Sequence, residues 1–160
     1  MHWMILPYRR YFEFSGRSRR KEYWWFFVFW VLLTVALGIG AIASIAGSLQ
    51  GLVQGGAQAW AGISGAFWVL LAVFGLFFLA SLIPMIAVQV RRLHDLGVSG
   101  WWYLAYIASG ALLPSIPNAG DGLNGLVSLG WLAWMFFPGT KGANKFGEDP
   151  KDPFNAEVFA

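Results

Sequence analysis

The sequence contains no cysteine and little charge. Only 12% of its 160 residues are Asp, Glu, Lys or Arg, about half the fraction usual for a soluble domain, whereas 58% are hydrophobic. Without cysteine the chain has no disulfide, no thiolate metal site and no cysteine nucleophile. Charge is missing altogether from residues 23–90. A soluble domain would expose much of such a segment, so the pattern indicates a chain that lies in a lipid bilayer.

Ionisable side chains are also missing from the depth of every expected span. Proton relays, ion-coupled carriers and charged pore rings need such groups within the membrane, so these classes are disfavoured. A small permease or channel with an uncharged path stays open as the alternative function. Asp121 has no second carboxylate at its depth, and His94 beside Asp95 has no nucleophile fixed nearby. We therefore expect no enzyme, no catalytic residue, no metal site and no cofactor.

Long apolar runs predict an all-α membrane protein, a small polytopic helical bundle. The first span is expected at residues 24–46, and the second at residues 66–90, where it ends in two arginines. The segment between them, residues 47–65, is rich in Gly, Ala and Gln and is expected to be a loop.

Two shorter apolar runs, residues 101–116 and 123–137, are separated by prolines and glycines. They fit either two short helices or one span broken by a re-entrant bend. With four spans and a cytoplasmic N-terminus, all eleven Lys and Arg residues lie inside and Asp121 lies outside, whereas three spans would export the lysines of the tail. The positive-inside rule therefore predicts four spans, two of them short, in the bacterial inner membrane.

Both ends of the chain are predicted to lie at the membrane surface. Residues 1–23 mix aromatic and basic side chains, which is typical of an interfacial arm. Residues 24–137 form the transmembrane helical domain. Residues 138–160 form an irregular, turn-rich, polar cytoplasmic tail that builds no core of its own.

The densest group of polar side chains is predicted on the cytoplasmic face. It fits a site for an anionic lipid headgroup, a phosphate or an acidic partner, because clustered arginines suit oxyanions. It also fits topology-setting charges joined by local ion pairs, which is the more common case. The acidic side chains of the tail are predicted to fold back onto these arginines. The predicted polar cluster consists of Arg17, Arg19, Arg20, Glu22, Arg91, Arg92, His94, Asp95, Asn144 and Asp149.

Small residues recur at four-residue spacing on the first span, at Ala36, Gly40 and Ser44. They form one smooth helix face that lets another helix approach closely, either within the chain or in a second copy. The expected partners are therefore the bilayer, anionic lipid headgroups, and a second copy or another membrane protein. Nucleic acid is not expected, because the basic residues flank hydrophobic spans rather than a soluble face.

Three segments resemble a known pattern. They are FSGRSRRKEYW at residues 14–24, RRLHDLG at 91–97 running into SGWW at 99–102, and PGTKGANKFGEDP at 138–150. Over residues 10–150 the chain resembles the bacterial inner-membrane family catalogued as domain of unknown function 805. The resemblance implies an inner-membrane location and a multi-span helical fold, and it brings no reaction or ligand. The expected function is that of a non-enzymatic membrane or interaction protein with a basic cytoplasmic face.

Overall fold

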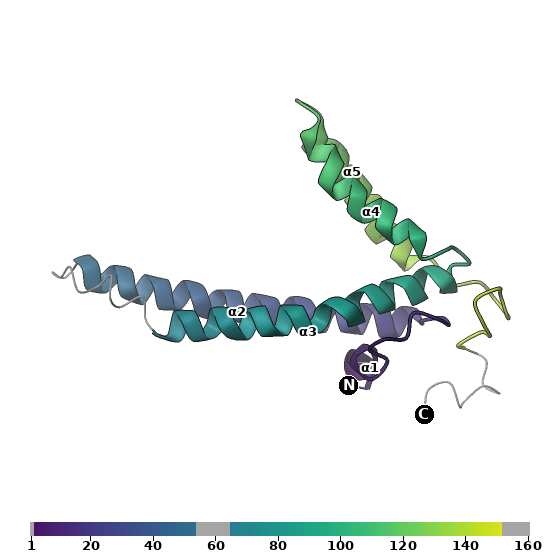
Figure 1. Ribbon diagram of the computed structural model, residues 1–160, viewed down its shortest axis with the longest axis horizontal. Helices are drawn as coiled ribbons and strands as arrows, with labels where there is room; N and C mark the ends of the chain where they lie inside the picture. The colour runs from purple at the N-terminus through teal and green to yellow at the C-terminus, as the bar shows by residue number, and fades with distance from the viewer. Residues whose placement is uncertain (1, 54–64, 152–160) are drawn as a thin grey trace.

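A computed structural model describes residues 2–53 and 65–151, and within these ranges the protein is helical (Figure 1). The only β-type pairing in the described part of the chain is an isolated bridge between Asn144 and Gly147. This confirms the predicted all-α class. The helices are α1 (His2–Arg9), α2 (Arg20–Val53), α3 (Gly65–Asp95), α4 (Trp101–Leu112), the 3-10 turn η2 (Leu113–Ser115) and α5 (Gly120–Phe136).

The two longest helices, α2 and α3, run side by side and form a long hairpin (Figure 1). Both are long and apolar enough to cross a membrane, over Arg20–Ala46 and Phe67–Asp95. Only 6% and 11% of the residues in their most apolar windows are buried inside the protein. Core helices of soluble proteins bury such residues, so this exposure is that of helices that lie in lipid.

The ends of α2 and α3 differ from those expected. Helix α2 begins at Arg20 rather than residue 24, and it continues to Val53 into the segment expected as a loop. The remainder of that loop, residues 54–64, lies outside the described residues. The Gly and Gln content predicted irregular structure here, and this prediction is wrong for residues 47–53, which extend α2 seven residues past the apolar stretch Arg20–Ala46. A helix that is already formed is extended at low cost, because each added residue gains a backbone hydrogen bond. Helix α3 continues to Asp95, where Gly97 with φ 78° ends it.

Helices α4 and α5 form a second, shorter antiparallel hairpin. The Tyr106 and Trp131 rings stack with centroids 4.5 Å apart, and Trp102 lies 6.5 Å from Trp134. At the turn, a side chain at Gly120 would collide with the backbone of η2, so the close return requires glycine there. Helix α4 has 12 residues and α5 has 17. The hairpin brings the chain back to the end at which α3 finished (Figure 1).

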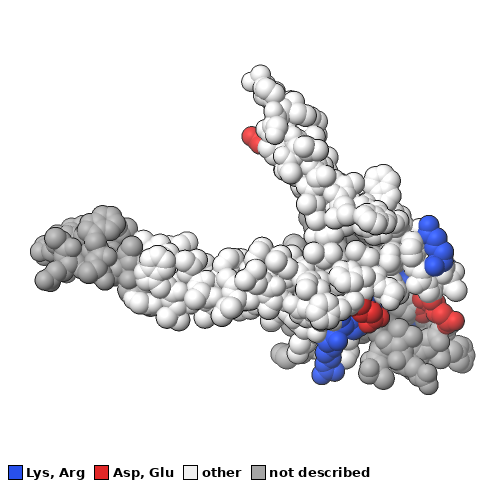
Figure 2. Space-filling view, in the orientation of Figure 1, with Lys and Arg blue, Asp and Glu red and all other residues white. Residues whose placement is uncertain are grey.

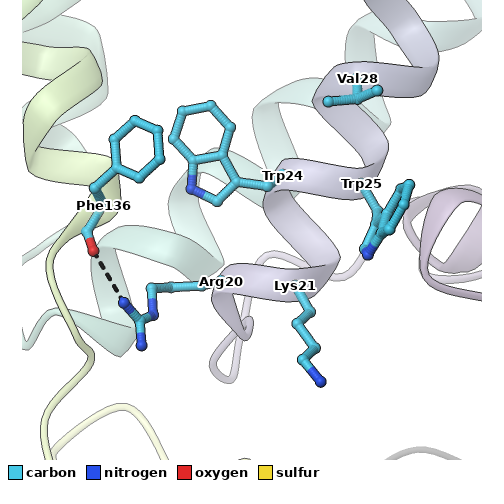
Figure 3. Close-up of a pocket in the computed structure, with 6 residues that line it drawn as sticks. All are labelled: Arg20, Lys21, Trp24, Trp25, Val28 and Phe136. Atoms are coloured by element: carbon cyan, nitrogen blue, oxygen red, sulfur yellow. Dashed lines mark hydrogen bonds between the residues drawn. The ribbon is translucent and has the colours of Figure 1, made fainter.

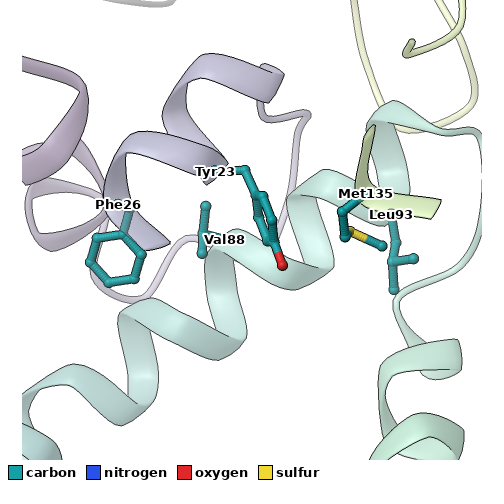
Figure 4. Close-up of a cluster of buried hydrophobic side chains, with 5 residues drawn as sticks. All are labelled: Tyr23, Phe26, Val88, Leu93 and Met135. Carbon is teal, nitrogen blue, oxygen red and sulfur yellow. The ribbon is translucent and has the colours of Figure 1, made fainter. Parts of the chain in front are cut away.

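The buried core is small and lies where the two hairpins meet (Figure 4). Helix α1 packs across α2 and α3 there, with the Tyr8 hydroxyl 2.7 Å from Ser81 Oγ of α3. The residues expected as an interfacial arm are therefore joined to the helical hairpin. The buried hydrophobic cluster is made of Tyr23 and Phe26 of α2, Val88 and Leu93 of α3, and Met135 of α5.

Candidate functional site

Charged side chains gather at the end where α1, the start of α2, the end of α3 and residues 138–151 meet (Figure 2). We call this the basic end. It holds all eleven Lys and Arg residues of the chain. Asp121 lies apart, at the start of α5 near the tip of the short hairpin. The structure thus brings together charges that the sequence places in three separate segments.

The first buried ion group at the basic end, the Asp95 group, consists of Asp95, Arg92 and Arg17. Arg92 and Asp95 lie one helical turn apart on α3 and form an ion pair. Arg17 enters from the loop before α2 and donates from Nη2 and Nε to Asp95 Oδ1, at 3.0 and 3.1 Å. The relative exposure of these residues is 0 to 3%. Buried charges are stable only when paired and hydrogen-bonded, so this group holds the loop against α3.

The second buried ion group, the Glu22 group, consists of Glu22, Arg91 and Arg10. Arg91 Nη2 donates to Glu22 Oε1 at 3.0 Å, and Arg10 lies 3.8 Å from the other carboxylate oxygen. Arg91 also donates to the backbone carbonyls of Glu13 and Arg10. This group therefore ties the chain after α1 to α2 and α3.

Arg10 and Glu13 extend the Glu22 group toward the surface. Arg10 Nε donates to Glu13 Oε2 at 2.7 Å. This hydrogen bond lowers the pKa of the Glu13 carboxyl and raises the pKa of the Arg10 guanidinium, with burial opposing both shifts. Both groups are therefore held in their charged forms at neutral pH.

The tail folds back onto Arg17, but through backbone oxygens. Arg17 donates to the carbonyls of Thr140 and Gly142, and the Thr140 amide donates to the Asp95 carbonyl at 2.8 Å. A side chain at Gly139 would collide with the Asp95 carboxylate, so the tail approaches closely only because that residue is glycine. These contacts agree with the prediction that the tail docks at this end. They are formed by backbone groups of the tail and not by its carboxylates.

Asp149 shows where a tail carboxylate acts instead. Its oxygens accept hydrogen bonds from the Lys151 amide at 2.9 Å and the Gly142 amide at 3.0 Å. These bonds, with the Lys151 amide contributing most, lower the pKa of the Asp149 carboxyl despite some burial. Asp149 therefore shapes the tail itself. Asp152, another of the acidic tail residues predicted to meet the arginines, lies outside the described residues.

His94 and Asn144 join the tail to the end of α3. The His94 ring stacks on Phe146 with centroids 4.0 Å apart, and its Nδ1 lies 3.1 Å from the Gly16 carbonyl oxygen. Asn144 Nδ2 donates to the His94 carbonyl at 2.9 Å. These contacts give His94 a packing role between the loop and the tail.

Arginines also cap the C-terminus of α5. Arg92 Nη2 donates to the carbonyls of Met135 and Phe137, and Arg20 Nη1 donates to the carbonyl of Phe136 at 3.2 Å. The last carbonyls of a helix have no partner within it and carry the negative end of its dipole. The short hairpin is thereby fastened to the long one by charge-assisted hydrogen bonds.

The predicted small-residue face lies partly against the neighbouring helix. A side chain at Gly40 would lie 3.3 Å from Leu70 Cδ1 of α3. Ser44 donates its hydroxyl to the Ala41 carbonyl, and Ala36 is exposed. Gly40 is thus at a close contact within the chain.

Sequence reasoning missed several residues of the basic end. Arg10 was counted only among the basic residues of the interfacial arm, and Glu13 was not considered. The carbonyl acceptors carry no signature in a sequence. The stacking of Phe146 on His94 was equally invisible. The sign that the sequence did offer was Gly139 beside a proline, because a glycine there allows the tail to come close to Asp95.

Two adjoining pockets lie at the start of α2, beside the ion groups. One, of about 290 Å³, is lined by Trp3, Arg19, Arg20, Lys21 and Lys151. The other, of about 410 Å³, is lined by Arg20, Lys21, Trp24, Trp25, Val28 and Phe136 (Figure 3). No group of three or more His, Cys, Asp or Glu residues in the described ranges is placed to hold a metal ion. The basic side chains that line these two pockets are suited to binding an anion.

A family model described as "Protein of unknown function (DUF805)" matches residues 11–148. The chain belongs to this family. The Escherichia coli K12 "Inner membrane protein YhaH" is 32% identical over 154 residues, covering 94% of this chain and 98% of the relative. "Inner membrane protein YhaI" of the same strain is 33% identical, covering 94% and 97%. "Uncharacterized protein YiiR" is 30% identical and covers 88% of each chain. No solved structure matches.

The DUF805 match covers the α2, α3 and most of the tail parts of the basic end, but not α1. The Asp95 group and the docked tail as far as Glu148 lie inside it, and Arg10 lies one residue before it. The family region therefore extends beyond the helices to the segments that hold the two hairpins together.

Proposed function

We propose that this DUF805 protein is a multi-pass inner-membrane protein, not an enzyme, whose basic end faces the cytoplasm and binds anionic lipid headgroups. The long and short hairpins supply four spans, two of them short, and both the N-terminus and the tail are cytoplasmic. The observation that carries the proposal is the gathering of all eleven Lys and Arg residues at one end. Relatives named inner membrane proteins support the location.

The basic residues divide into two sets with different roles. The first set is buried and consists of Arg17, Arg91 and Arg92. These arginines pair with Asp95 or Glu22 and donate to backbone carbonyls, so they stabilise the fold. The second set, which reaches the surface, attracts the negatively charged inner leaflet, where each basic residue contributes about 1 kcal/mol. Its exposed members are Arg9, Arg20, Lys21, Lys141, Lys145 and Lys151.

Reporter fusions and vesicle binding test the two parts of the proposal. A periplasm-active phosphatase fused after Asp121 is expected to be active, whereas the same reporter after Lys151 is expected to be inactive. The purified full chain in nanodiscs is expected to retain phosphatidylglycerol over phosphatidylcholine, with a preference that weakens as salt rises. An active phosphatase after Lys151 would overturn the topology, and equal retention of both lipids would overturn the headgroup function.

A further inference from the structure

The two pockets at the start of α2 are neighbours, and we call the one lined mainly by basic side chains the charged half and the other the apolar half. They share Arg20 and Lys21. The charged half adds Arg19 and Lys151, so four basic side chains and no carboxylate line it. The apolar half adds aromatic and aliphatic side chains of α2 together with Phe136 of α5. A ligand that fits both halves has an anionic head joined to an apolar chain.

The order of side chains along α2 matches the order of groups in a phospholipid. Arg20 and Lys21 occupy the first turn, Trp24 and Trp25 the next, and Val28 the one after (Figure 3). Each turn rises about 5.4 Å, so basic, aromatic and aliphatic groups follow one another into the membrane. Basic side chains and tryptophans are the groups that proteins place at headgroup depth.

The two basic side chains that both pockets share, Arg20 and Lys21, are exposed and still have hydrogen-bonding capacity. Lys21 is exposed and makes no hydrogen bond or ion pair with another described residue. Arg20 is fixed by one hydrogen bond to the Phe136 carbonyl, which leaves other N–H groups of its guanidinium for an anion. Trp24 stacks on Phe136 with centroids 4.0 Å apart and forms a rigid apolar wall.

We propose that one anionic phospholipid binds in these two pockets, with its phosphate held by Arg20 and Lys21 and an acyl chain lying along Trp24, Val28 and Phe136. The lipid would thereby rest against both hairpins at the point where α5 meets α2. The proposal deepens the proposed function and rests on it, because it assigns a defined site to an attraction that the whole basic end would otherwise share.

The charged half is tested by removing one charge inside the site and one outside it. Binding of phosphatidylglycerol to the purified full chain is measured by native mass spectrometry, with phosphatidylcholine as the reference lipid. Lys21→Gln is expected to weaken phosphatidylglycerol binding about fivefold, because a basic residue at the surface contributes on the order of 1 kcal/mol. Lys141→Gln removes the same charge from the same end, outside both pockets, and is expected to weaken phosphatidylglycerol binding less than Lys21→Gln does, because it changes only the general attraction of the basic end.

The apolar half is tested with Val28→Trp, which fills the pocket, and with Val35→Trp two turns further along α2, where the side chain is 51% exposed and outside the pocket. Only Val28→Trp is expected to weaken phosphatidylglycerol binding. Water-soluble glycerol phosphate, which has no acyl chain, is expected to bind at least tenfold more weakly than the lipid.

Three results would overturn the site. Equal weakening by Lys21→Gln and Lys141→Gln would show a diffuse attraction, which leaves the proposed function standing without a site. Equal binding of glycerol phosphate and lipid would show a phosphate site with no lipid specificity. No preference of the wild type for phosphatidylglycerol over phosphatidylcholine would overturn both the site and the proposed function.

Discussion

Asp95 joins three segments of the basic end: the loop before α2, the end of α3 and the tail. Its carboxylate binds Arg17 and Arg92, and its backbone carbonyl accepts from Thr140. Removing one partner of a buried ion pair leaves charge uncompensated in a medium of low polarity, which is more costly than losing an exposed pair. The stability of this end therefore depends on Asp95 more than on any surface charge.

Asp95→Asn is expected to destabilise the protein by about 3 to 5 kcal/mol, because Arg17 and Arg92 lose their counter-charge while they stay buried. The measurement is the free energy of unfolding in mixed detergent micelles. Asp121→Asn is the matched control, since Asp121 is exposed near the tip of the short hairpin. Equal stability of the two variants would show that the Asp95 group does not hold the fold.

Asp149 provides a pH dependence whose sign follows from its contacts. The Lys151 and Gly142 amides lower its pKa below the ordinary value of 3.8, so the stabilisation is complete at neutral pH and is lost as the pH falls through the lowered pKa. Hydrogen exchange at these two amides, corrected for its intrinsic rate, is expected to be constant down to about pH 5 and to accelerate below about pH 4. Asp149→Asn is expected to show weaker protection at neutral pH and no such transition.

The sequence predicted the positions of those helices that depend on the surrounding lipid. It did not predict structure that depends on individual contacts. The apolar runs located α2 and α3 because lipid tolerates little else, and Gly97 marked the end of α3 because only glycine readily takes its conformation. Residues 47–53 were misjudged because their Gly and Gln content was given more weight than the low cost of extending a helix that is already formed. The docking of the tail was anticipated from charge, whereas its carbonyl acceptors depend on a backbone path that no side-chain pattern records.

Close packing of α2 on α3 is tested at Gly40. A Cβ there would lie 3.3 Å from Leu70 Cδ1, and a full leucine side chain would push the helices apart. Gly40→Leu is expected to cost about 1 to 3 kcal/mol and to lower the thermal midpoint in detergent. Gly38→Leu is the matched control on the same helix, since a side chain at Gly38 would meet nothing within 4 Å. Equal midpoints for the two variants would contradict a close contact at Gly40.

The two hairpins share a base, which is the basic end, and they differ in length. They diverge from the basic end (Figure 1), so their distant parts expose apolar side chains rather than pack on each other. The buried core and both ion groups lie at this base. The angle between the hairpins is therefore set by the contacts at this shared base.

The proposed crossing of the membrane by the short hairpin implies a mismatch with the bilayer that labelling can detect. At about 1.5 Å per residue, and about 2 Å in a 3-10 turn, α4 with η2 spans about 24 Å and α5 spans about 26 Å, both less than a hydrocarbon core of about 30 Å. Asp121, near the tip, should therefore reach the outer surface only where the bilayer is thin or locally thinned.

Because the chain has no cysteine, Asp121→Cys introduces a single label site. In vesicles with the basic end inside, labelling of this site by a membrane-impermeant maleimide is expected to fall as the lipid acyl chains lengthen. Lys141→Cys, at the basic end, is expected to stay protected from outside at every chain length. Equal external labelling of Asp121→Cys in thin and thick bilayers would contradict the mismatch. Labelling of it only after the vesicles are opened would mean that the short hairpin does not cross the membrane, because its tip would then lie on the same side as its base.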